Sequence, residues 1–149
     1  MEITRHFTST VLIVHRSRVL LHLHKKFGSL LPVGGHVERD ELPEEAALRE
    51  VKEETGLSVQ LYNPDPTLFP DVRLLVRPVH MLLIPINPYH QHIDFIYYAT
   101  TETEQIDPQF EESNQLHWYT HEEILAAPMP ENVRILALEA LALLGKPSS

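Results

Sequence analysis

The chain has 149 residues, of which 43% are hydrophobic and 22% charged, and it has a formal net charge of −9. That length is enough for one domain with a buried core. The acidic excess argues against non-specific binding to nucleic acid or to an anionic membrane, because both need a basic face. The sequence has no cysteine, which excludes disulfide scaffolds, thiolate zinc sites and thiol nucleophiles.

The N-terminal segment has none of the features of a secretory signal: no basic start, no long apolar run and no small-residue cleavage site. The best candidate for a membrane span, residues 81–86, is far too short. We therefore expect a single soluble domain over residues 1–149, located in the cytoplasm.

The first third of the chain is predicted to contain strands. Residues 8–14 and 19–23 are rich in β-branched and aliphatic side chains and are separated by four polar residues, which is typical of a hairpin. Residues 30–33 form a short apolar run followed by Gly34 and Gly35. This pattern predicts a strand that ends in a flexible turn.

A helix is predicted between Pro43, which suits a first helical turn, and Gly56, which suits a C-terminal cap. Apolar side chains at helical spacing support it. A strand is expected over residues 57–61. The next eleven residues, 62–72, contain three prolines and are predicted to form an irregular loop.

The second half of the chain is predicted to contain more strands and then two helices. The expected strands span residues 73–86, 93–100 and 115–119, and the turn between the first two covers residues 87–92. Thr120 and Glu123 form a capping box that predicts a short helix from His121, and a final helix is expected over 130–144. Elements mixed in this order predict an α/β fold with a mixed sheet between helices.

Acidic residues are concentrated between positions 38 and 54, where eight acidic and three basic side chains give a net charge of −5. In the predicted helix, Glu50, Glu53 and Glu54 have the i, i+3, i+4 spacing that places them on one face. Carboxylates are hard ligands that suit Mg²⁺ or Mn²⁺. Such a cluster beside flexible glycines favours phosphoryl transfer or hydrolysis over a merely solvated helix face.

The segment from Gly35 to Leu57 resembles the Nudix box. Five residues separate Gly35 from Glu41, and seven more separate Glu41 from the run Arg49-Glu50-Val51-Lys52-Glu53-Glu54-Thr55-Gly56-Leu57. The resemblance implies an α/β/α sandwich. It also implies that a divalent metal, Mg²⁺ or Mn²⁺, supports hydrolysis of a nucleoside diphosphate linked to another group.

The resemblance also assigns roles to individual residues. Glu53 and Glu54 correspond to metal ligands, Glu50 to a ligand or to the base that activates water, and the Gly35 carbonyl to a further ligand. Arg49 is expected to orient these carboxylates together with Glu41, so the expected catalytic set is Glu50, Glu53 and Arg49.

In some relatives the base comes from a later loop, and here Glu111 and Glu112 are the candidates. The alternative for this pair is a solvated loop with no catalytic role.

Ten histidines are many for this length. His36 follows Gly35 and is a candidate hydrogen-bond donor to substrate. His90, His92 and Asp94 alternate, so they would share one strand face and could hold a metal, but a flat face does not close a tetrahedral site. We therefore expect a polar stripe in which His92 and Asp94 line the substrate cleft, while His22 and His24 are expected to be ordinary sheet residues.

The expected function is hydrolysis of a pyrophosphate bond in a small substrate such as a nucleoside di- or triphosphate or a nucleotide sugar. The alternative is a non-catalytic nucleotide-sensing module of the same fold. Isopentenyl diphosphate isomerisation, on a similar fold, would need a cysteine. RNA cap removal would need a basic tract, and this chain lacks both. No nucleic-acid polymer or membrane partner is expected, and a homodimer is compatible with the resemblance.

Overall fold

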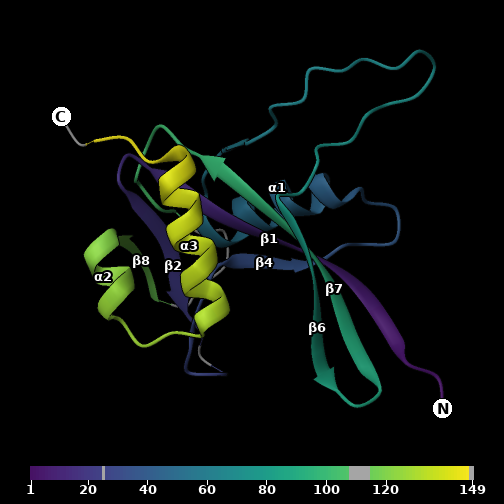
Figure 1. Cartoon of the computed structure of the whole chain (residues 1–149), viewed down its shortest axis with the longest axis horizontal. Coiled ribbons are helices and arrows are strands. Elements are labelled where there is room, and N and C mark those ends of the chain that lie inside the picture. Colours follow the sequence, from purple (N-terminus) through teal and green to yellow (C-terminus); the bar gives the residue numbers. More distant parts are fainter. Residues whose placement is uncertain (25, 108–114, 148–149) are drawn as a thin grey trace.

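The computed structural model describes residues 1–24, 26–107 and 115–147 (Figure 1). In these residues one mixed sheet contains eight strands. The strands are β1 (Thr4–His15), β2 (Arg18–Leu23), β3 (Leu30–Leu31), β4 (Val33–His36), β5 (Gln60–Leu61), β6 (His80–Asn87), β7 (His90–Thr100) and β8 (Gln115–Thr120). The helices are α1 (Pro43–Thr55), α2 (His121–Ala126) and α3 (Glu131–Leu144).

The long strand β1 organises the sheet. It pairs with β2 and with β4 in antiparallel fashion, and with β7 in parallel over eleven residue pairs, from Thr4 opposite His90 to Val14 opposite Thr100. Strand β6 extends the sheet beyond β7, and β8 pairs with β2. The predicted hairpin and the predicted mixed sheet are therefore confirmed.

Helices cover both faces of the sheet, and each face has its own core. Leu12 and Val14 of β1 pack toward α2 and α3, in a cluster that includes Leu136. Their neighbours Val11 and Ile13 point the other way and join the cluster beneath α1. This alternation is the period of two expected of a strand that is buried on both faces. In Figure 1, α3 lies in front of the sheet and α1 behind it. The α/β class predicted from the sequence is confirmed.

The helix ends follow the predicted capping residues. Pro43 opens α1, and Gly56 ends it at φ 75°, in the left-handed region, where its N–H donates to the Lys52 carbonyl. The Thr120 hydroxyl accepts a hydrogen bond from the Glu123 N–H at the start of α2, as predicted. Among the described residues, no helix is long and apolar enough to cross a membrane.

The structure corrects the predicted turn after residue 33. Gly34 and Gly35 lie inside strand β4 and pair with Thr10 and Ser9 of β1. The interruption comes earlier, at Pro32, between β3 and β4. Proline has no N–H to donate to a ladder, so it separates two short strands.

The predicted strand over residues 73–86 begins only at His80. The segment before it bonds to α1 instead of to a strand, because the Glu44 carboxylate accepts from the Val76 N–H at 2.8 Å and from the Arg73 guanidinium at 3.1 Å. The irregular loop therefore runs from residue 62 to residue 79 and projects from the body (Figure 1). Similarly, the strand expected over 57–61 is reduced to Gln60–Leu61.

Candidate active site

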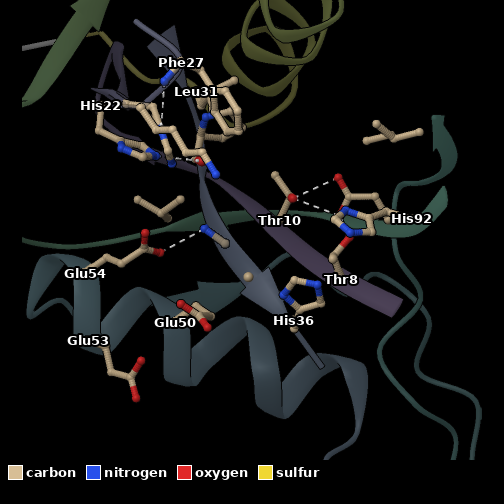
Figure 2. Close-up of a pocket in the computed structure, with 18 of the residues that line it drawn as sticks. Thr8, Thr10, His22, Phe27, Leu31, His36, Glu50, Glu53, Glu54 and His92 are labelled. Carbon is tan, nitrogen blue, oxygen red and sulfur yellow. Dashed lines mark hydrogen bonds between the residues drawn. The ribbon is translucent and has the colours of Figure 1, made fainter. Parts of the chain in front are cut away.

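A cleft of about 630 Å³ opens where β4 meets α1 and the middle of β1 and β7 (Figure 2). This volume lies in the range of sites that enclose a small organic ligand. Polar groups from several elements line it: Thr8 and Thr10 from β1, His22 from β2, Gly34, Gly35 and His36 from β4, Glu50, Glu53 and Glu54 from α1, His92 and Asp94 from β7, and His24 and Lys26 after β2.

The three carboxylates of α1 all line this cleft, as their spacing predicts. Glu54 is fixed by the Gly34 N–H, which donates to its Oε2 atom at 2.9 Å. Figure 2 shows Glu50 and Glu54 on the side of α1 that faces β4, and Glu53 directed away from β4. The helix thus presents two carboxylates to the strand and a third beside them.

Both glycines of β4 stand where another part of the chain approaches closely. A Cβ atom on Gly35 would lie 2.4 Å from Oε1 of Glu50, and one on Gly34 would lie 2.3 Å from the Ser9 carbonyl oxygen. Real Cβ contacts are longer than 3.0 Å. Glycine therefore lets the strand backbone sit directly against the Glu50 carboxylate on one side and against β1 on the other.

Arg49 connects the carboxylates to each other. Its guanidinium donates to both oxygens of Glu41, at 2.7 and 3.0 Å, to Glu50 at 2.9 Å and to Glu53 at 3.3 Å. It also donates to the His36 carbonyl at 3.0 Å, which ties α1 to the end of β4. A planar guanidinium with fixed donors suits such a clamp, so the structure supports an orienting role for Arg49.

The cluster is short of positive charge. The pKa of Glu54 is raised to about 8, first by burial and then by the Glu50 charge, against the lowering effect of the Gly34 N–H. Burial likewise raises the pKa of Glu50, although Arg49 opposes it. Glu41 differs, because its hydrogen bond to Arg49 lowers its pKa. Oxygen donors this close, with too few cations among them, fit a hard divalent ion such as Mg²⁺.

The substrate-side candidates come from β4 and β7 and also line the cleft. His36 and His92 are neighbours, with ring centroids 5.0 Å apart at 82°. Asp94 is buried and accepts hydrogen bonds from the hydroxyls of Thr8 at 3.0 Å and Thr10 at 2.8 Å. Burial raises the pKa of Asp94, so this carboxyl group holds its proton more tightly than an exposed one.

Some cleft residues differ from the expectation. His22 lies in β2, as expected of a sheet residue, whereas His24 follows the end of that strand, and both line the cleft. Thr8 and Thr10 were not predicted to line the cleft. The one signal in the sequence is that they alternate on a predicted strand, so their side chains share one face. Glu111 and Glu112, the candidates for an alternative base, lie outside the described residues.

Comparison with known proteins identifies the family of this chain. The sequence profile of the NUDIX domain matches residues 4–139. The chain is 46% identical to a NUDIX-family hydrolase from Clostridium perfringens, with a TM-score of 0.85 over 95% of this chain and 99% of that one. The MutT protein of Methanosarcina mazei Go1 shares the fold at 18% identity, with a TM-score of 0.72 over 94% of this chain and 95% of that one.

The NUDIX domain of NrtR from Shewanella oneidensis, solved in complex with ADP ribose, also shares the fold. It is 15% identical, with a TM-score of 0.68 over 94% of this chain and 88% of that one. The profile match spans most of the chain. This chain belongs to the Nudix family of hydrolases.

Proposed function

We propose that this protein hydrolyses a pyrophosphate bond in a small nucleoside diphosphate-linked substrate, with the aid of Mg²⁺ or Mn²⁺. The observation that supports this most directly is the approach of the Glu50 carboxylate to the Gly35 backbone, beside Glu54 and Glu53, in a cleft of nucleotide size. Hard oxygen donors and exposed backbone together suit a metal-bound pyrophosphate.

In this proposal Glu53, Glu54 and the Gly35 carbonyl hold the metal. The bound ion would polarise the phosphoryl oxygens and offset the charge that develops on them. Arg49 fixes the carboxylate positions through its bonds to Glu50 and Glu53. Preorganised ligands of this kind avoid reorganisation during the reaction.

We assign to Glu50 the role of the general base, with a third metal ligand as the alternative. A base works best when its pKa is closer to the working pH, and burial raises the pKa of Glu50 in that direction. Its bond to Arg49 keeps the carboxylate oriented. When it accepts a proton from water, the negative charge beside Glu53 and Glu54 decreases, which favours the transfer.

For the substrate we propose a nucleotide sugar or a nucleoside di- or triphosphate. ADP ribose, which is bound in the NrtR domain structure, belongs to the first group. His36, His92 and Asp94 are proposed to contact the part of the substrate beyond the pyrophosphate, since they line the same cleft as the carboxylates.

We also propose that the protein acts as one domain spanning residues 1–149, in the cytoplasm, and forms a homodimer. The dimer is supported by exposed apolar side chains on the α1 side of the β6–β7 region. Phe7, Met81 and Leu83 are 53%, 62% and 58% exposed. Contiguous apolar surface of this kind commonly marks an interface.

The test is a panel of nucleoside diphosphate-linked compounds, incubated with the protein in Mg²⁺ and in EDTA, with product measured by chromatography. Glu53→Gln should lower turnover at least about 100-fold, as loss of a metal ligand does. Glu102→Gln, an exposed glutamate remote from the cleft, is the matched control and should match the parent. Turnover in EDTA, or full activity in Glu53→Gln, would refute the proposal, and tight binding without product would favour the sensing module.

A further inference from the structure

A second group of side chains beside the cleft has the composition of a metal site. His6 of β1 lies directly opposite His92 of β7 in the parallel register, and His90 lies two residues before His92. We call His6, His90 and His92 the three-histidine group. One ring nitrogen from each lies within 4.8 Å of the other two.

The rings lie close together, edge-on or tilted to one another. His6 Nδ1 and His90 Nε2 form a hydrogen bond of 2.8 Å, which a bound ion would replace, and the centroid of His6 lies 4.8 Å from that of His90 and 6.5 Å from that of His92. In a tetrahedral zinc site with bonds near 2.1 Å, ligand nitrogens are separated by about 3.4 Å. The observed separations bracket this value, so small side-chain rotations would bring three ligands onto one ion.

The third ligand of the group comes from a second strand of the sheet. Along β7, alternating residues form a flat row, and Asp94 of that row turns to Thr8 and Thr10 instead of to the histidines. The third nitrogen comes from the neighbouring strand β1. Because His6 stands beside His92 on the same face of the sheet, the three ligands form a triangle instead of a row, which leaves room for an ion between them.

One nitrogen of this group is buried and unpaired within the part of the chain that the structure describes. The Nε2 atom of His92 is shielded from solvent, and among the described residues it has no hydrogen-bond partner. Leaving a buried polar atom unsatisfied costs about 1–3 kcal/mol, so such an atom calls for an explanation. A metal ion bonded to this nitrogen supplies one.

We propose that the three-histidine group binds one borderline transition-metal ion, represented by Zn²⁺, at a site separate from the carboxylates of α1. Imidazole nitrogens select Zn²⁺, Co²⁺, Ni²⁺ or Cu²⁺, whereas carboxylates and carbonyls select Mg²⁺ or Mn²⁺. The ion would join the N-terminal end of β1 to β7 at the wall of the cleft. Its fourth position is open to water.

An anion is the competing ligand, because protonated histidines attract phosphate. One nitrogen from each of the three rings lies within 4.8 Å of the other two, and the imidazole nitrogen is the commonest metal ligand in proteins. His36 adds a fourth ring, 5.8 Å from His6. This convergence of nitrogens favours the metal.

The proposal is tested by titrating Zn²⁺ into the full-length protein in excess Mg²⁺, followed by calorimetry, with the Co²⁺ absorption spectrum as a second readout. We expect one Zn²⁺ per chain and a tetrahedral Co²⁺ spectrum. His6→Gln and His90→Gln should each weaken binding at least about tenfold. His6 is exposed, so its replacement leaves the fold intact.

Two variants serve as controls. His117→Gln removes an exposed histidine that contacts Glu123, and Glu54→Gln removes a carboxylate of the other site. Both should bind Zn²⁺ as the parent does. Unchanged Zn²⁺ affinity in His6→Gln and His90→Gln, or a loss in Glu54→Gln, would overturn the proposal. The proposal would also be overturned if Zn²⁺ did not bind and the protein instead bound inorganic phosphate, with that binding abolished by His6→Gln and by His90→Gln. None of these outcomes depends on Mg²⁺-dependent hydrolysis.

Discussion

Replacing Glu54 by glutamine is predicted to stabilise the metal-free protein in alkaline solution. Burial and the Glu50 charge raise the pKa of Glu54 from its ordinary 4.5 to about 8. The folded state therefore holds this proton more tightly than the unfolded state. Stability is unaffected below about pH 4.5, falls as the pH rises toward 8, and stays reduced above it. Glutamine has no charge to bury, and its carbonyl can still accept from the Gly34 N–H.

The size of the effect follows from the pKa. A rise from 4.5 to about 8 corresponds to roughly 5 kcal/mol of penalty for the ionised carboxylate. The cleft is open to water, which screens part of it, so we expect about 2 kcal/mol at pH 9 and a small difference at pH 5. For a chain of this length 2 kcal/mol raises the melting temperature by about 4–8 °C.

The assay is urea unfolding of the parent and of Glu54→Gln in EDTA at pH 5 and pH 9, with Glu102→Gln as the surface control. Addition of Mg²⁺ should reverse the order. The parent gains about 2.7 kcal/mol at a metal concentration 100 times its Kd, and the variant gains less. A variant that is less stable than the parent at pH 9 in EDTA would refute the reasoning, because the carboxylate would then be stabilising without a cation.

Three further substitutions test the supporting structure. Gly35→Ala places a Cβ 2.4 Å from Oε1 of Glu50, and the Glu50 carboxylate must therefore move. We expect steady-state kinetics to show a fall in kcat of about 100-fold and thermal unfolding to show little change in melting temperature. Arg49→Lys loses the two-pronged contact with Glu41; kcat should fall at least about tenfold, and urea unfolding should show a loss of about 2 kcal/mol. Gly56→Ala is strained at φ 75° and brings a Cβ within 2.1 Å of the Asp107 carbonyl oxygen. The free energy of unfolding should fall by at least about 2 kcal/mol, while the activity per folded molecule stays unchanged. Equal kcat in Gly35→Ala and the parent, or a stable Gly56→Ala, would contradict these arguments.

The fold was predictable where local chemistry decides it. Pro43 and Gly56 bracket α1, and Thr120 with Glu123 starts α2, because caps satisfy backbone groups within a few residues. The segment 73–79 was not predictable, since its apolar run favours a strand while its backbone bonds to Glu44, about thirty residues earlier. Such a contact exists only after α1 has packed on the sheet.

The same distinction applies to the site. Three carboxylates on one helix face follow from helical spacing alone, so Glu50, Glu53 and Glu54 could be grouped from the sequence. Strand pairing is a property of the whole sheet, and no local pattern indicates that His6 lies opposite His92 or that Thr8 and Thr10 hold Asp94. Side chains from β1 therefore had to be found in the structure.

The charges around Arg49 limit how a phosphate can enter. When all are ionised, Glu41, Glu50, Glu53 and Glu54 share one guanidinium, which leaves a net charge of −3. Each divalent ion bound would reduce this negative charge by two and so weaken the repulsion of a pyrophosphate. Fixing the carboxylates with a single arginine therefore keeps them in position without neutralising them, so binding of the phosphate depends on the metal.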